Sequence, residues 1–309
     1  MVYRMTGKSP VSDNIVVLMS TYNGSRYIKE QLTSIYSQKG VSCSLLVRDD
    51  GSSDDTCSIL EKEQCDGKLK WYSGTNLGPA MSFLDLLKHA PKADYYAFSD
   101  QDDVWLDDKL KSAIDHLGGG QEHPALYFCQ TQLVDKNLKK LDSVKINPLV
   151  TYGEALAYQF IGGCTMVFND ALRNIIVQYT PGYMRMHDIW IYDVALAVGA
   201  SVYFDPIPHI LYRQHGDNTV GQLDSCAFRW KARMDRMRHE GHIRSRIASE
   251  LYNGFKDSMS LENRRLTERV VNYRHSLKDK IHLLCSSDLK CAEKSIRFTS
   301  KLAILFNLF

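Results

Sequence analysis

A short acidic segment, Asp100-Gln101-Asp102-Asp103, is the most informative feature of the 309-residue sequence. Carboxylates at positions i and i+2 after a strand can hold a divalent ion. Such hard oxygen ligands favour Mg²⁺ or Mn²⁺, which usually bridge to substrate phosphates. A lone Asp-x-Asp is more often a solvated acidic turn. The apolar flanks, Phe98 and Val104-Trp105, weaken that simpler interpretation, because a solvated turn needs no adjacent tryptophan.

Asp188 is a candidate general base. It follows His187 and precedes an apolar helical segment at 189–198, and a carboxylate there can accept the proton of an acceptor hydroxyl. An aspartate near a helix start is also suited to cap the helix, and spacing alone favours the cap.

Polar residues that follow a later strand-like run add Arg213 and His215 to the candidates. His215 suits a metal ion and Arg213 suits the charge of a diphosphate, although lone residues of these types are more often ordinary loop side chains. Gly162-Gly163 permits close approach of the backbone to a ligand, or else a bulge or tight turn. Asn76 lies in a turn by composition.

The apolar pattern predicts a sheet that positions these residues. Short apolar runs indicate strands, and helical segments alternate with them, with Ser25 placed to cap the first helix. This alternation is typical of an α/β fold with a Rossmann-like, mostly parallel central sheet flanked by helices. The predicted strands lie at residues 15–19, 44–48, 69–72, 95–98, 126–129, 162–168 and 202–204, the last before a turn at Pro206 and Pro208.

Three polar clusters directly follow predicted strands. They are Thr21-Tyr22-Asn23, Asp49-Asp50 and the acidic segment itself. In parallel sheets, ligands bind beyond the carboxyl ends of the strands. We therefore expect these clusters, which are far apart in the sequence, to converge on one edge of the sheet.

The composition is that of an ordinary globular protein, with 44% hydrophobic and 24% charged residues. The net charge of +2 gives no reason to expect nucleic-acid binding. The 8 cysteines form no C-x-x-C pair and no zinc spacing, which indicates reduced thiols. Residues 1–14 lack the apolar core of a signal peptide, and no apolar run approaches the roughly 20 residues of a membrane span. We expect a cytoplasmic protein, or one attached to the inner membrane face without crossing it.

The character of the chain changes after about Asp224, where a strand-poor, helical pattern begins. We predict a catalytic domain over residues 1–224 and a helical C-terminal extension over residues 225–309. Basic residues crowd 229–246, and cations alternate with apolar residues over 295–309. A basic amphipathic helix at this end would lie on an anionic membrane surface, or pack its apolar face on the catalytic domain or on a second subunit of a homodimer. The sequence leaves both open.

Together and in this order, the motifs resemble those of the family 2 glycosyltransferases, which are inverting enzymes of the GT-A fold. The resemblance covers roughly residues 13–222. The Asp-Gln-Asp-Asp-Val-Trp form is similar to the bacterial branch that builds surface polysaccharides such as lipopolysaccharide and capsule, where rhamnosyl and related transferases are common. The motifs are Ser20-Thr21-Tyr22-Asn23-Gly24, residues 48–54, Asn76-Leu77-Gly78, residues 100–105, Gly162-Gly163-Cys164, His187-Asp188-x-Trp190 and residues 212–215.

The resemblance implies a role for each matching position. Asp188 would be the catalytic base, with His187 and Trp190 on the acceptor side. Asp102 and His215 would hold Mg²⁺ or Mn²⁺. The nucleotide sugar would be bound by Thr21, Tyr22, Asn23, Asp49, Asn76, Asp100, Gly163 and, more loosely, Arg213. One departure is that the family usually has an acidic residue before the base, where this chain has His187.

The resemblance implies transfer of a sugar from a UDP- or dTDP-linked donor, dTDP-rhamnose among them, to a hydroxyl of a growing, lipid-linked surface glycan. One displacement inverts the anomeric centre, so no covalent intermediate is expected. Two rival functions use the same residues: a nucleotidyltransferase or phosphohydrolase, and a catalytically silent GT-A-like nucleotide-binding module. The phosphohydrolase needs an aspartyl nucleophile followed by threonine, which the acidic segment lacks. The silent module predicts a broken site, whereas Asp102, Asp188 and His215 are all present.

Overall fold

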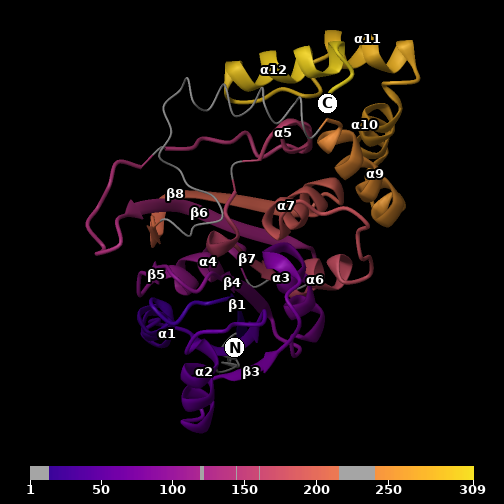
Figure 1. Ribbon diagram of the computed structural model, residues 1–309. Coiled ribbons are helices and arrows are strands. Elements are labelled where there is room, and N and C mark those ends of the chain that lie inside the picture. The colour runs from indigo at the N-terminus through magenta and orange to yellow at the C-terminus, as the bar shows by residue number, and fades with distance from the viewer. Residues whose placement is uncertain (1–13, 119–121, 144, 160, 216–240) are drawn as a thin grey trace, which may run out of the picture.

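The computed structural model describes residues 14–118, 122–143, 145–159, 161–215 and 241–309. Among them, one eight-stranded sheet of order β3-β2-β1-β4-β7-β6-β8-β5 forms the centre of the molecule (Figure 1). Its strands are β1 (Asn14–Thr21), β2 (Ser42–Asp49), β3 (Lys70–Ser73), β4 (Tyr95–Ser99), β5 (Val104–Trp105), β6 (Ala125–Val134), β7 (Val167–Asn169) and β8 (Ser201–Arg213).

The N-terminal half of the sheet is parallel. β1 pairs in parallel with β2 and β4, and β2 pairs in parallel with β3. β7 is antiparallel to both of its neighbours, β8 pairs in parallel with β6, and the short β5 is antiparallel to β8. The predicted α/β fold is confirmed, with the antiparallel β7 inserted between its two parallel parts and the antiparallel β5 at one edge.

Helices cover both faces of the sheet, as burial along β1 shows. Val16 and Leu18 belong to one apolar core, and Ile15, Val17 and Met19 belong to another, because successive strand side chains point to opposite faces. The second core is completed by α1 (Ile28–Tyr36), α2 (Thr56–Cys65) and α4 (Lys109–Leu117). The first is completed by α3 (Gly78–His89), α5 (Tyr152–Ala157), α6 (Asp170–Ile176), α7 (His187–Ala197) and the C-terminal helices.

Two predicted strands have different limits in the structure. In place of a strand over 162–168, a 3₁₀ turn at Gly163–Thr165 precedes the three-residue β7. The strand predicted at 202–204 continues as β8 through Pro206 and Pro208, where we expected a turn. The pairing of β8 with β6 shifts register at Gln130, and such irregularities accommodate prolines, which cannot donate to the ladder.

The helix starts also correct the capping predictions. Ser25 does not cap the first helix, because α1 begins at Ile28 with Tyr27 in the cap position and no side-chain cap bond. The backbone N–H of Ser25 instead donates to Asp54 Oδ2 at 3.0 Å, which ties the loop after β1 to the loop after β2.

The C-terminal helices pack on the catalytic part of the chain. They are α9 (Ile243–Phe255), α10 (Leu261–Asn272), α11 (Leu277–Cys285) and α12 (Lys294–Leu305). Phe255 of α9 lies against Trp190 of α7, with ring centroids 5.8 Å apart, and both belong to the first core. The predicted boundary at 224/225 and the basic residues from Arg229 to Arg238 lie outside the described residues.

No helix among the described residues has the length and apolar character that crossing a bilayer requires.

Candidate functional site

The ends of β1 and β2 meet as expected. Thr21 pairs with Asp49 in the parallel register, and its Oγ1 donates to Asp49 Oδ1 at 3.0 Å. The other carboxylate oxygen of Asp49 accepts from the backbone N–H groups of Gly51 and Ser52, at 3.1 and 2.8 Å. Asp49 is fully buried, so its carboxylate organises the loop after β2 and does not face an open site.

Gln101 joins the first of these loops to the acidic segment. Its Nε2 donates to the carbonyl of Tyr22 at 3.0 Å, and its Oε1 accepts from the Tyr22 N–H at 2.9 Å. A Cβ at Gly24 would lie 2.0 Å from Gln101 Oε1, so glycine is required for this approach. The Tyr22 side chain remains half exposed, as a residue that meets a ligand should be.

Two asparagines complete the loop network at these strand ends. Asn23 adopts a left-handed conformation with φ 49°, and its Oδ1 accepts from the Ser53 N–H at 2.8 Å. Asn76 Oδ1 accepts from the Gly78 N–H at 3.1 Å. That N–H also donates to Asp50 Oδ2 at 2.9 Å, which connects the loop before α3 to the end of β2.

The acidic segment meets the end of β8. Asp102 Oδ2 lies 2.8 Å from His215 Nε2, across 113 positions of sequence. The His215 ring packs on Tyr27, with centroids 4.9 Å apart, which orients the imidazole. A carboxylate oxygen and an imidazole nitrogen at this distance can turn toward a shared divalent ion, so these two residues fit Mn²⁺ or Mg²⁺.

Arg213 makes contacts that hold the acidic segment in place. Its side chain is buried, and Nε donates to the Asp102 carbonyl at 2.7 Å while Nη2 pairs with Glu30 at 2.5 Å. Its backbone N–H donates to Asp103 Oδ1 at 3.0 Å. These contacts favour a role in positioning the acidic segment over the direct diphosphate contact that we predicted from the sequence.

An acidic cluster, in which Asp103 and Cys164 are buried and Asp100 is partly buried, lies beside Asp102. Asp100, Asp103 and Cys164 offer ligand atoms that all lie within 4.8 Å of one another. Burial, followed by the charges of Asp102 and Asp188, raises the pKa of Asp100 to about 7. Burial also raises the pKa of Asp103, whose Oδ2 has no hydrogen-bond partner among the described residues. The Cys164 thiol has a raised pKa as well, and a protonated thiol is a poor ligand for a hard cation.

Lys109 is a member of the site that the sequence did not reveal. Its side chain is fully buried, and Nζ lies 3.2 Å from the centroid of the Trp105 ring. Burial lowers its pKa to about 8, while the nearby carboxylates of Asp103 and Asp100 oppose that change. A lysine at the start of a helix is ordinarily solvated, so only the packing of α4 on the sheet reveals this internal cation.

Asp188 faces this cluster from the start of α7. Its Oδ2 accepts from the Gly163 N–H at 3.1 Å, and its Oδ1 accepts from the Ile189 N–H at 2.7 Å. The cap position belongs to Met186, so the interpretation of Asp188 as an N-cap is wrong. Gly163 is required where it stands, because a Cβ there would lie 2.2 Å from His187 Nε2.

The comparisons with known proteins identify the family of the chain. Residues 16–176 match the family described as Glycosyl transferase family 2. The chain is 32% identical over 235 residues to the dTDP-rhamnosyl transferase RfbG of Shigella flexneri, which covers 69% of this chain and 77% of that protein. The chain belongs to glycosyl transferase family 2.

Solved structures show that this family 2 chain has the GT-A fold. TarS residues 1–349 from S. aureus, in complex with UDP-GlcNAc, superposes with a TM-score of 0.58 at 18% identity, covering 96% of this chain and 82% of that one. The mannosyltransferase PcManGT from Pyrobaculum calidifontis, in complex with GDP-Man and Mn²⁺, gives a TM-score of 0.51 at 17% identity, with coverage of 99% and 88%.

Two residues that we expected on the acceptor side are buried in this family 2 chain. The His187 ring stacks on Phe83 at 3.9 Å between centroids, and burial lowers its pKa to about 4, which keeps the imidazole neutral. Trp190 is only 2% exposed and packs between Tyr179 and Phe255. Direct contact of either side chain with an acceptor is not supported. Both instead fix the start of α7, and with it Asp188.

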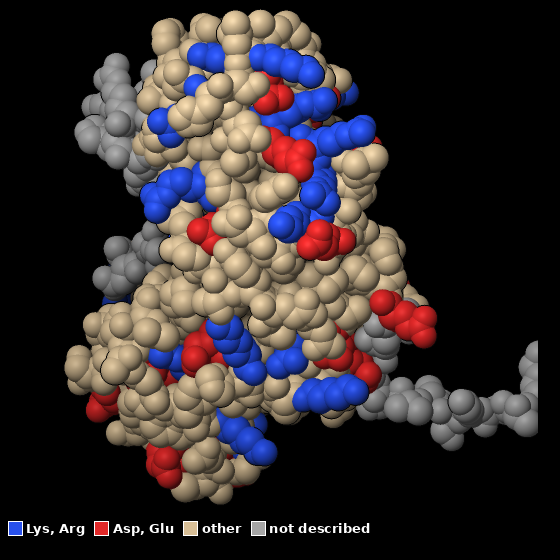
Figure 2. Space-filling view, turned by 90° about the vertical axis from the view of Figure 1, so that its right-hand side faces the viewer, with Lys and Arg blue, Asp and Glu red and all other residues tan. Residues whose placement is uncertain are grey.

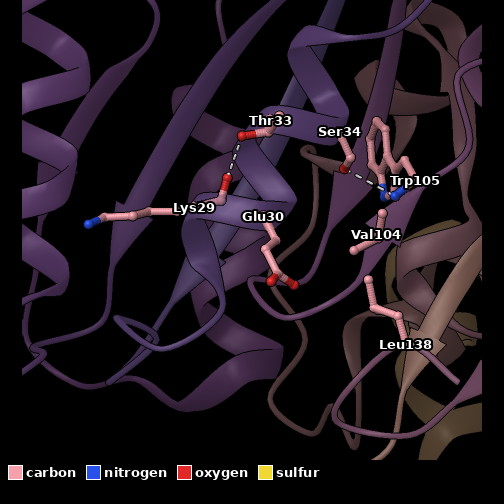
Figure 3. Close-up of a pocket in the computed structure, with 7 residues that line it drawn as sticks. All are labelled: Lys29, Glu30, Thr33, Ser34, Val104, Trp105 and Leu138. Atoms are coloured by element: carbon pink, nitrogen blue, oxygen red, sulfur yellow. Dashed lines mark hydrogen bonds between the residues drawn. The ribbon is translucent and has the colours of Figure 1, made fainter.

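An open hollow of about 570 Å³ lies on the outer side of α1 and β5 (Figure 3). Glu30, whose carboxylate pairs with Arg213, projects into it, and the Trp105 ring lies at its edge. Its other lining residues are Lys29, Thr33, Ser34, Val104 and Leu138. Two of its lining residues contact the candidate site directly, because Glu30 pairs with Arg213 and the Trp105 ring packs on Lys109.

Proposed function

We propose that this chain is an inverting glycosyltransferase that moves a sugar from a UDP- or dTDP-linked donor to a hydroxyl of a growing, lipid-linked surface glycan. The catalytic part would span residues 1–224 and the helical extension residues 225–309. The enzyme would act on the cytoplasmic side of the inner membrane.

The observation that carries the proposal is the position of Asp188. Its Oδ2 is held by the Gly163 N–H at 3.1 Å, and the next residue, Cys164, has its sulfur within 4.8 Å of carboxylate oxygens of Asp100 and Asp103. The charge of Asp188 also contributes to the raised pKa of Asp100. A base beside the group that binds the leaving phosphate is the arrangement that a single displacement needs. No side chain has to act as a nucleophile.

The bond changes then balance in one step. The acceptor oxygen forms a bond to the anomeric carbon from the face opposite the departing group, and its proton passes to Asp188. The bond from the anomeric carbon to the phosphate oxygen breaks, and the nucleoside diphosphate leaves with that electron pair. The configuration at the anomeric carbon inverts.

Asp102 and His215 would hold Mn²⁺ or Mg²⁺, which when bound stabilises negative charge on the departing diphosphate. The 2.8 Å approach of these two side chains supports this assignment. The buried Asp103 Oδ2, which has no hydrogen-bond partner among the described residues, also supports it. Asp100 would help to bind the ribose and the ion.

Thr21, Tyr22, Asn23, Asp49 and Asn76 would shape the nucleotide pocket. Tyr22 alone among these combines a large ring with half exposure, so we assign it the base contact, while Asp49 acts through the loop that it organises. The similarity to RfbG favours dTDP-rhamnose as the donor.

The decisive experiment is a screen of the purified full chain against UDP-, dTDP- and GDP-linked sugars, each with Mn²⁺, with Mg²⁺ and with a chelator. We expect slow release of UDP or dTDP from one donor, abolished by the chelator. Binding of a nucleotide with no release, even when glycan acceptors are supplied, would favour the silent module. A folded protein that binds no nucleotide would overturn the proposal.

A further inference from the structure

The last helix of the chain has two apolar faces. Ile296, Ala303 and Ile304 of α12 are buried in the first core, where α12 packs on α11 and on α5. Phe298 and Leu305, seven residues apart and therefore on one side of the helix, are each at least half exposed. The sequence left open whether this helix packs on protein or faces outward, and the described residues do both.

Helix α11 extends the exposed side. Leu277 and Ile281, one helical turn apart, are each more than half exposed. Two lysines join the helices: Lys301 Nζ donates to the Leu284 carbonyl at 2.5 Å, and Lys280 Nζ donates to Asn307 Oδ1 at 3.1 Å. We call the exposed apolar side chains of this surface the C-terminal patch: Leu277, Ile281, Phe298, Leu305 and Phe306.

Five large exposed apolar side chains on or directly after two helices that pack together are unusual for a solvated surface, where such residues occur singly. The patch also lies at one end of the molecule, because α11 and α12 form its outermost layer in Figure 1. It is therefore a surface that another body can approach without obstruction from the sheet.

The surroundings of the patch are basic. Residues 241–309 contain thirteen Lys or Arg and seven Asp or Glu, so this part carries more positive charge than the whole chain with its net +2. Figure 2 shows Lys and Arg side chains gathered over the upper end of the molecule, with fewer Asp and Glu among them. The exposed cations on α11, on α12 and in the segment between them are Lys278, Lys290, Lys294 and Arg297.

We propose that the C-terminal patch binds the surface of an anionic lipid bilayer, with its apolar side chains in the headgroup region and its cations on the lipid phosphates. Basic helices with an exposed apolar face lie in the interface plane in this way, and anionic lipids attract each nearby Lys or Arg. A second copy of the chain is disfavoured as occupant, because a two-fold interface would oppose two patches of the same charge.

This inference rests on the proposed function, because binding to the bilayer would bring the candidate site to a lipid-linked acceptor. The surface is tested without catalysis, by flotation of the purified full chain with vesicles of phosphatidylcholine alone or with about one third phosphatidylglycerol. We expect binding to the anionic vesicles only, weakened when salt rises from about 0.1 to 0.5 M, because screening shortens the reach of the cations.

Two double variants separate the contribution of the apolar side chains to membrane binding from that of the cations. Phe298→Ser with Leu305→Ser removes apolar contact, and Lys294→Glu with Arg297→Glu reverses two charges. Each should weaken binding about tenfold or more, given typical contributions of buried apolar area and interfacial cations. The matched controls are Ile207→Ser, an equally exposed apolar residue on β8, and Lys62→Glu on α2, and both should bind as the unaltered chain does.

Equal binding to neutral vesicles, or unchanged binding by both patch variants, would overturn the proposal. So would self-association in light scattering that the patch variants abolish, with no flotation, since the occupant would then be a second copy. Release of nucleoside diphosphate in solution should be unchanged in the patch variants. A failure of membrane binding is thereby distinguishable from a failure of the glycosyltransferase assignment.

Discussion

The two halves of the candidate site differ in how well their buried polar atoms are satisfied. On the nucleotide side, the loops after β1 and β2 are cross-bonded, with the Asp49 carboxylate and the Gln101 amide both fully engaged. On the catalytic side, Asp103 Oδ2, Lys109 Nζ and both His187 nitrogens are buried without hydrogen-bond partners among the described residues.

This difference suggests that the two halves recognise their ligands by different means. The nucleotide half is held in shape by backbone donors and needs no ligand to order it. The catalytic half concentrates carboxylates in a buried setting, which is costly unless a positive charge offsets them. Four predictions test this comparison, from the largest expected effect to the smallest.

Asp188→Asn should remove most of the transfer activity. The amide cannot accept the acceptor proton, and loss of a general base typically costs about 10²- to 10⁴-fold in rate. Nucleotide affinity, measured by calorimetry, should change by less than about twofold, because a base does not hold the nucleotide. Asp115→Asn, on the exposed side of α4, is the control. Equal loss of nucleotide binding would place Asp188 in the nucleotide half.

Asp102→Asn and His215→Ala should each raise the Mn²⁺ concentration for half-maximal activity by more than about 100-fold. Loss of an outer-shell partner lowers metal affinity by up to about 100-fold, and loss of a direct ligand should lower it further. The double variant should be little worse than either single one, because the two residues serve one ion. Full activity of either variant in a chelator would disprove this metal assignment.

Gly24→Ala and Gln101→Ala should weaken nucleotide binding about tenfold each, because both break the clamp between Gln101 and the Tyr22 backbone. The double variant should bind no worse than Gln101→Ala alone, because without the amide the added methyl meets no obstacle. Gln38→Ala, which removes an amide that bridges Leu106 and Leu110 elsewhere, controls for general loss of stability. If the losses of affinity in the two single variants add up in the double variant, the clamp does not couple the loops.

Asp193→Asn should change the dependence of stability on pH. Burial raises the pKa of Asp193 to about 7. Between about pH 4 and pH 7 the unfolded chain releases this proton while the folded chain keeps it, so the free energy of unfolding falls as pH rises over this interval. The asparagine variant lacks this titration, so its melting temperature should rise relative to the unaltered chain over that interval. The Gln159 partner is retained in both proteins. A constant difference between pH 4 and 8 would contradict the raised pKa.

Local patterns were enough to predict much of the nucleotide half. Apolar runs such as 15–19 identify buried strands, and the residues after parallel strands must share an edge, so Thr21, Asp49 and the acidic segment were expected together. The roles of Arg213, His187 and Trp190 could not be predicted in the same way. Their residue types suggested ligand contacts, whereas their burial and partners favour supporting roles.

The sequence by itself determined the parallel core of the sheet, because short apolar runs mark buried strands. Its ordered motifs determined the resemblance to family 2 glycosyltransferases, and that resemblance made Asp102, Asp188 and His215 the candidates. The tertiary structure alone decided that Lys109 lies beneath the acidic cluster, that β8 passes through two prolines, and that α12 divides its apolar residues between packing and exposure. Exposure and long-range partners depend on how distant elements pack, and no local pattern records that.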